Sequence, residues 1–89
     1  SSLEQSRTRL ARAKEAIAAA AAAEVRSGES VLLDVGSTTL AVAHALVART
    51  DLSEVVIVTN GLAVALALEP AIPRFTVVVT GGTVRSLQH

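Results

Sequence analysis

Apolar runs alternate along the chain with polar or glycine-containing breaks, and the first run is the longest. The segment from Leu3 to Ser27 consists almost entirely of strong helix formers. Ser1 and Glu4 have the spacing of a capping box at its start, and Gly28 follows as a stop signal. The pattern therefore predicts one long N-terminal helix.

The side chains divide this predicted helix into a charged half and an alanine-rich half. The charged side chains are Arg7, Arg9, Arg12, Lys14 and Glu15, and the apolar ones near one face are Leu10, Ile17, Ala20, Ala21 and Val25. We expect the first half to be a solvated arm. We expect the second half to pack closely on a sheet, because small alanine side chains allow close approach.

Three apolar runs of strand length follow, at residues 30–35, 54–60 and 74–82, separated by helical segments at 38–49 and 61–68. The runs are continuous rather than alternating, which is typical of strands buried on both faces. This order predicts right-handed crossovers and a parallel sheet with helices on its faces. The fold class is thus α/β: a three-stranded parallel Rossmann-like βαβαβ half-domain preceded by a long N-terminal helix.

Polar residues and glycines stand where each predicted strand ends. They are Asp34, Gly36, Ser37, Thr38 and Thr39 after the first strand, Thr59 and Asn60 after the second, and Gly81, Gly82 and Arg85 after the third. The carboxyl ends of parallel strands share one edge of the sheet, and ligands of open α/β sheets bind there. We therefore expect these residues to meet at a common rim and to bind a ligand.

The chemistry of the first cluster fits an anion such as phosphate. Gly36 permits a tight turn, and Ser37, Thr38 and Thr39 offer hydroxyl donors where the next helix exposes unpaired N–H groups and its positive dipole end. The alternative is structural: Ser37 or Thr38 is an N-cap, and Asn60 caps the following short helix. The convergence of three clusters, with the donor fork of Arg85 within reach, favours the ligand site.

Composition excludes several other classes of function. Eight basic residues balance eight acidic ones, so the chain lacks the electrostatic footprint of a nucleic-acid binder. It contains no cysteine, and His44 and His89 have no ligand-type neighbours, so we expect neither a metal site nor a cofactor. We see no pairing of nucleophile and base and no glycine-rich nucleotide fingerprint, so we do not expect an enzyme.

Length and hydropathy indicate whether the chain is a complete domain and where in the cell it is located. With 89 residues it supports one domain or part of one, and it would bury only about 60 to 65% of its unfolded surface, which suggests an incomplete unit. The alanine-rich run at 16–23 is flanked by charges and is neither a membrane span nor a signal peptide. We expect a cytoplasmic protein with no membrane contact.

Three motifs in this order, "LDVGSTT", "VTN" and "GGTVR", resemble the first half of the effector-sensing domain of DeoR-type bacterial transcription regulators. The resemblance runs from about Arg12 to Arg85. It implies a truncated effector-sensing domain at residues 12–89, after a linker or arm helix that starts at 1–11. It also implies a fold similar to that of ribose-5-phosphate isomerase and glucosamine-6-phosphate deaminase.

The resemblance further implies a repressor that senses a phosphorylated sugar or a related metabolite. The Gly36–Thr39 loop would hold the phosphate, Asn60, Gly81 and Gly82 would line the same cavity, and Arg85 matches the arginine of the family. Operator DNA would be bound only through a winged helix-turn-helix that is absent from this chain. We expect a homo-oligomer, because apolar faces of a half-domain need cover. The alternatives are a fragment of a sugar-phosphate isomerase or deaminase, or an oligomerisation domain with a vestigial pocket.

Overall fold

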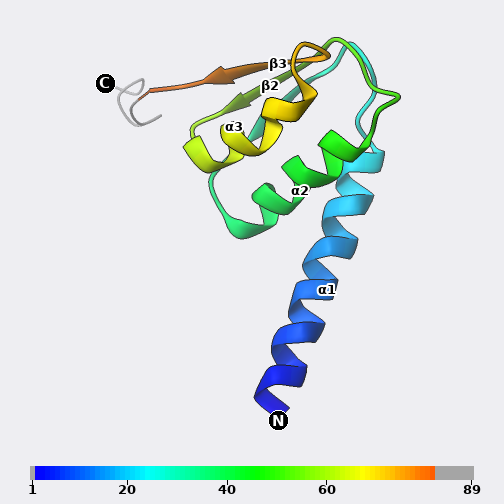
Figure 1. Cartoon of the computed structure of the whole chain (residues 1–89), viewed down its shortest axis with the longest axis vertical. Coiled ribbons are helices and arrows are strands. Elements are labelled where there is room, and N and C mark those ends of the chain that lie inside the picture. Colours follow the sequence, from blue (N-terminus) through cyan, green and yellow to red (C-terminus); the bar gives the residue numbers. More distant parts are fainter. Residues whose placement is uncertain (1, 82–89) are drawn as a thin grey trace.

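The computed structural model describes residues 2–81, in which helices and strands alternate as the sequence predicts (Figure 1). The elements are α1 (Ser2–Ala23), β1 (Ser30–Leu33), α2 (Ser37–Ala48), β2 (Val55–Thr59), α3 (Leu62–Leu68), the 3-10 turn η1 (Glu69–Ala71) and β3 (Phe75–Val79). The three strands form one parallel sheet in the order β1-β2-β3. The predicted α/β fold is therefore confirmed.

The end of α1 lies earlier than predicted. The helix stops at Ala23, because the amides of Glu24 and Val25 donate to carbonyls only three residues back, which tightens the last turn. Gly28 instead lies in the turn before β1, with a φ of 86° that suits glycine, and its amide donates to the Ser53 carbonyl. Ser1, the first residue of the predicted capping box, lies outside the described residues.

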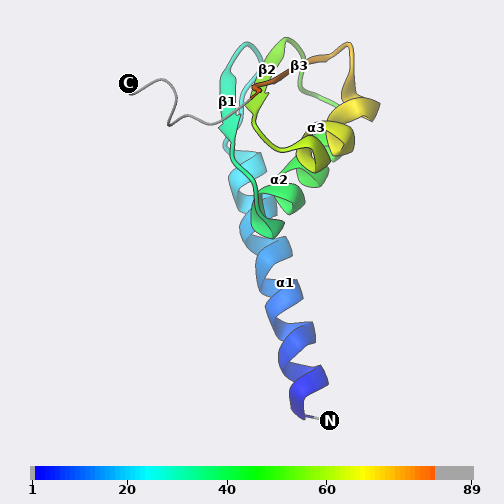
Figure 2. The same ribbon diagram turned by 90° about the vertical axis from the view of Figure 1, so that its left-hand side faces the viewer.

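The helices cover one face of the sheet, which corrects the expectation of cover on both faces (Figure 2). Each strand pairs with the next in the same direction, so two right-handed crossovers place α2 and α3 on the same side. On the opposite face Leu32 is 77% exposed and Val78 is 43% exposed. The continuous apolar runs thus belong to strands with one face packed and one apolar face open within residues 2–81.

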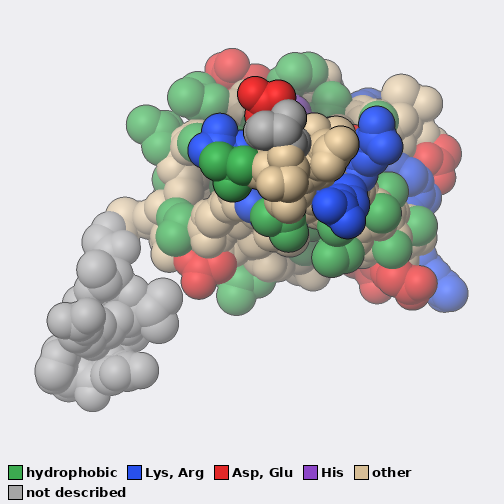
Figure 3. Space-filling view, turned by 90° about the horizontal axis from the view of Figure 1, so that it is seen from below, with side chains coloured by type: hydrophobic (Ala, Val, Ile, Leu, Met, Phe, Trp, Pro, Cys, Tyr) green, Lys and Arg blue, Asp and Glu red, His purple; other side chains and the backbone are tan. Residues whose placement is uncertain are grey.

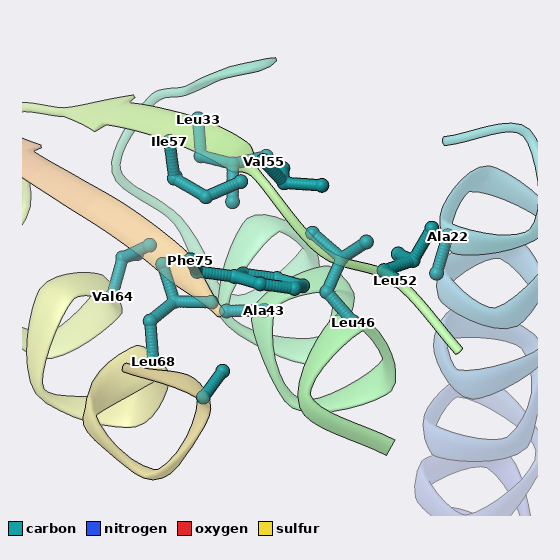
Figure 4. Packing of buried hydrophobic residues seen from close by; sticks show 11 residues of the cluster. Ala22, Leu33, Ala43, Leu46, Leu52, Val55, Ile57, Val64, Leu68 and Phe75 are labelled. Atoms are coloured by element: carbon teal, nitrogen blue, oxygen red, sulfur yellow. The ribbon is translucent and has the colours of Figure 1, made fainter. Parts of the chain in front are cut away.

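The hydrophobic core lies between the sheet and the two crossover helices (Figure 4). Phe75 at the start of β3 lies among side chains of α2 and α3, and Val55 and Ile57 approach from β2. The alternate residues of β2 are buried because they point to this side of the sheet. This packing fixes the ends of the strands and the start of each crossover helix.

The long helix α1 packs against α2 rather than against the sheet, because α2 already covers the sheet there. Its buried side chains are Ala18 and Ala22, four residues apart on one face, whereas Leu10 and Ile17 are 63% and 59% exposed. The prediction of the packed face was therefore wrong for Leu10, Ile17, Ala20 and Ala21, which are exposed, and right for Val25, which packs against the core just after the helix ends. The solvated first half is confirmed, since residues 2–17 are all exposed and α1 projects beyond the body of the molecule.

Candidate functional site

The strand register brings the carboxyl ends of the three strands side by side. Leu33, Thr59 and Val79 are partners in one row across the sheet. The amide of Thr80 continues the ladder by donating to the Thr59 carbonyl at 2.9 Å. The turns that follow β1 and β2 and the residues that follow β3 therefore all begin at the same edge.

A hollow of about 320 Å³ opens at this edge, between the turn that leads into α2 and the turn that leads into α3. Its lining is Val35, Gly36, Ser37 and Leu40 from the first turn and Gly61, Leu62, Ala63 and Val64 from the second. Gly81 does not line this hollow and lies in open space. Of the predicted site residues, Gly36 and Ser37 line the hollow. Asp34, Thr38, Thr39, Thr59 and Asn60 lie in or next to the two turns but do not line it, and Gly82 and Arg85 lie outside the described residues.

Gly36 has a backbone conformation that only glycine adopts readily. Its φ and ψ are 142° and 160°, and it is the N-cap of α2. The Gly36 carbonyl accepts the amide of Leu40 at 3.0 Å and the hydroxyl of Thr39 at 2.9 Å. The glycine thus turns the chain sharply out of the sheet and into the helix.

The first turn of α2 has no side-chain cap. This differs from the structural alternative in which Ser37 or Thr38 is the N-cap, since both residues lie inside the helix. The first amides of a helix have no partner within it, and they carry the positive end of the helix dipole. The amides of this turn are therefore available to an outside acceptor beside the hollow.

The hydroxyls of this turn differ in their present contacts. The Ser37 Oγ accepts a hydrogen bond from the Lys14 Nζ of α1 at 2.9 Å, and the Thr39 Oγ1 donates to the Gly36 carbonyl. Thr38 is exposed and its hydroxyl has no hydrogen-bond partner within residues 2–81. The Asp34 carboxylate is exposed and accepts the Val35 amide at 2.8 Å. Thr38 is thus the hydroxyl most open to a ligand.

The second cluster shapes its own turn. Thr59 is fully buried, and its hydroxyl oxygen accepts the Gly61 amide at 3.1 Å. Asn60 is exposed and is not the cap of α3, because that position belongs to Gly61, again without a side-chain cap. Thr59 thus stabilises the turn from the buried side through this hydrogen bond, while Asn60 lies on the solvent-exposed side.

Gly61 and Val35 are residues of the hollow that the sequence analysis missed. A Cβ atom on Gly61 would lie 3.1 Å from the Val35 Cγ1, so the two turns touch where this glycine lacks a side chain. The signal in the sequence is the glycine itself, placed directly between the strand and the helix after Asn60. The contact with Val35 has no signal in the sequence, because it depends on how the two turns pack.

Residues 2–81 contain no group of three or more His, Asp or Glu side chains that could hold a metal ion. His44 is exposed on α2. Within the same residues, no helix has the length and apolar character needed to cross a membrane. The start of α2 offers hydrogen-bond donation from backbone amides and hydroxyls at this edge, and the exposed Asp34 carboxylate and Asn60 amide lie next to it.

Comparison with known proteins identifies the family of this chain. Residues 10–89 match the family model of the DeoR C terminal sensor domain. The chain belongs to this family. The DeoR sensor-domain chain is also similar to the HTH-type transcriptional regulator GolR of Listeria innocua serovar 6a, with 39% identity over 71 residues. That match covers 80% of the chain and 26% of GolR, so the chain spans about a quarter of the length of this relative. No solved structure matches the chain.

Proposed function

We propose that this chain is the effector-sensing part of a DeoR-type transcriptional repressor and that it binds the phosphate group of a phosphorylated sugar or related metabolite at Gly36–Thr39. The observation that carries the proposal is the uncapped first turn of α2 beside the hollow, in a member of this sensor-domain family. A phosphate at this turn accepts hydrogen bonds from backbone amides and lies at the positive end of the helix dipole.

The hollow suits the non-phosphate part of a small effector. Its volume of about 320 Å³ is at the lower end of the range of small-molecule sites, and its lining is mostly apolar with a few polar atoms. Asp34 and Asn60 lie exposed at the same edge, where they accept and donate hydrogen bonds to sugar hydroxyls. We propose that Gly82 and Arg85 complete the site, as expected from the resemblance, while Gly81 leads the chain towards it and Thr59 holds the turn before α3.

The proposal for the whole protein follows from the family. GolR is named an HTH-type transcriptional regulator, and we propose that the protein containing our chain likewise binds operator DNA through a separate winged helix-turn-helix. Residues 12–89 then belong to the sensing unit, and residues 1–11 form the arm that leads towards DNA. The role is regulatory rather than enzymatic, the setting is the cytoplasm, and the apolar outer face of the sheet supports self-association.

Ligand-dependent thermal unfolding of the chain tests the proposal. Glucose 6-phosphate and ribose 5-phosphate are compared with glucose and ribose, so that each pair differs only in the phosphate. We expect the melting temperature to rise with at least one phosphorylated sugar and to stay constant with the free sugars, because a ligand that binds only the folded state stabilises it. Equal shifts within a pair would show that the phosphate is not recognised.

Backbone amide chemical shifts locate the binding. We expect the largest phosphate-dependent changes at Ser37, Thr38 and Thr39, whose amides form the first turn of α2. Changes confined to other elements of the chain would remove the proposed site even if a sugar phosphate binds.

A further inference from the structure

A hydrogen bond joins the projecting arm of α1 to the turn that we propose as the phosphate site. The Nζ of Lys14 donates to the Oγ of Ser37 at 2.9 Å, across 23 residues of sequence. Lys14 lies four residues before Ala18 and eight before Ala22, on the stripe of α1 that packs against α2. It is thus the side chain of the exposed half of α1 that reaches the start of α2, where the two helices lie side by side (Figure 2).

The other basic side chains of the arm are placed differently. At about 100° per residue, Arg9 and Arg12 lie roughly 140° and 160° around the helix from Lys14, and Arg7 lies on the same face but about 10 Å nearer the free end of the helix. Basic side chains accordingly surround the free end of α1 when the molecule is viewed towards that end (Figure 3). Proximity to the loop is therefore a property of Lys14 and not of the arm as a whole, which makes Arg9 a suitable control.

The Lys14 ammonium group lies where an anion would be favourable, and it has no anionic partner within residues 2–81. A cation is stabilised near the C-terminal end of a helix, whereas Lys14 lies beside the positive N-terminal end of α2. No carboxylate within residues 2–81 forms an ion pair with it. Its contact in this structure is the neutral hydroxyl of Ser37. An anion between the two elements would accept hydrogen bonds from both the ammonium group and the first amides of α2.

We propose that Lys14 is the residue through which effector occupancy reaches α1, an inference that rests on the proposed phosphate site. When phosphate occupies the turn, the Lys14 ammonium leaves the Ser37 hydroxyl and donates to a phosphate oxygen. A hydrogen bond between two charged groups is stronger than one from the ammonium group to a neutral hydroxyl, so the part of α1 around Lys14 is held more firmly to the start of α2. Lys14 thus contacts Ser37 in the free state and phosphate in the bound state, and this difference makes the arm more ordered when the effector is bound.

Hydrogen–deuterium exchange of the chain, with and without inorganic phosphate as the probe, tests this coupling. In the wild type we expect phosphate to slow exchange both at residues 37–39 and in the arm at residues 8–16. Lys14→Met keeps most of the unbranched side chain and removes the ammonium group with its charge. We expect this variant to bind phosphate about tenfold more weakly and to show no slowing of the arm even when phosphate saturates the loop. Lys14→Arg restores the slowing, and Arg9→Met behaves as the wild type.

The outcomes separate the two proposals. If phosphate protects residues 37–39 equally well in the wild type and in Lys14→Met, and the arm responds alike in both, the loop binds phosphate and the role of Lys14 is wrong. Equal effects of Lys14→Met and Arg9→Met would reduce the role to general positive charge, which also overturns it. Absence of any protection at residues 37–39 in the wild type would overturn the phosphate site and the coupling together.

Discussion

Arg49 and Asp51 form a two-point ion pair at the end of α2: Nε donates to Oδ1 at 3.0 Å and Nη2 donates to Oδ2 at 2.7 Å. The remaining nitrogen, Nη1, donates to the carbonyls of Ala22 at 2.7 Å and Val25 at 3.1 Å, at the end of α1. The last turn of α1 contains no basic residue, so Arg49 provides the cation that the negative end of its dipole favours. Asp51 thus orients the guanidinium group that fixes the end of α1.

The Arg49–Asp51 pair predicts a dependence of stability on pH. Hydrogen bonds from Arg49 are the main cause that lowers the pKa of Asp51 below its ordinary value of 3.8, and the charge of Arg74 adds to this. Because the carboxylate releases its proton more readily in the folded than in the unfolded state, the pair stabilises the fold fully above pH 3.8 and loses that effect as the pH falls below it. Urea unfolding at pH 7 and pH 3 measures this loss of unfolding free energy.

We expect Asp51→Asn to lower the free energy of unfolding at pH 7 and to differ less from the wild type at pH 3. The matched control is Glu69→Gln, which changes an exposed carboxylate outside this pair. If Asp51→Asn and the wild type differ by the same amount at both pH values, the ion pair does not contribute to the acid response.

The alternation of elements could be predicted from the sequence because each element has a local signal, but its packing could not. The end of α1 is fixed by Arg49, which is 27 residues away from Ala22, and no local pattern encodes such a contact. The one-sided sheet likewise follows from the strand order, and the apolar runs are compatible with more than one order. The packed stripe of α1 was misjudged because its partner is α2 and not the sheet.

In the candidate site, too, the features that are local in sequence could be predicted and the contacts between separate elements could not. Gly36 and the hydroxyls after it are adjacent in sequence, so the pattern alone places them at the start of α2. The contact of Lys14 with Ser37 and the approach of Gly61 to Val35 join separate elements. They could not be predicted, because both depend on how separate elements pack in the folded chain.

The backbone of Gly36 predicts a site-specific effect of a small substitution. Gly36→Ala forces alanine into a conformation that is nearly exclusive to glycine, and we expect it to lower the free energy of unfolding by about 1–3 kcal/mol and to weaken sugar-phosphate binding. Gly28→Ala is the control, because Gly28 also has a positive φ, of 86°, but lies before β1, away from the hollow. Both variants should be destabilised in urea unfolding, and only Gly36→Ala should lose affinity in titration calorimetry. Equal affinities would show that the turn geometry does not matter for binding.

The approach of Gly61 to Val35 predicts a coupled pair of substitutions. The Cβ of Gly61→Ala would lie 3.1 Å from the Val35 Cγ1, and the exposed Val35 side chain must move by a few tenths of an ångström. We expect a loss of about 1 kcal/mol for Gly61→Ala, with about 0.5–1 kcal/mol of it recovered in the background Val35→Ala. Urea unfolding of the four proteins gives the coupling, and strictly additive losses would contradict a contact between the two turns.

Thr38 and Thr39 predict different consequences of the same isosteric change. The Thr38 hydroxyl is exposed without a partner within residues 2–81, so Thr38→Val should leave stability unchanged within about 0.5 kcal/mol. It should weaken sugar-phosphate binding about tenfold, because it removes a hydrogen bond to a charged group at constant volume. Thr39→Val also weakens binding and in addition loses the hydrogen bond to the Gly36 carbonyl, so its stability should fall as well. Thr50→Val, an exposed change between α2 and β2, is the control for both measurements. Unchanged affinity in both Thr38→Val and Thr39→Val would mean that the loop only starts the helix.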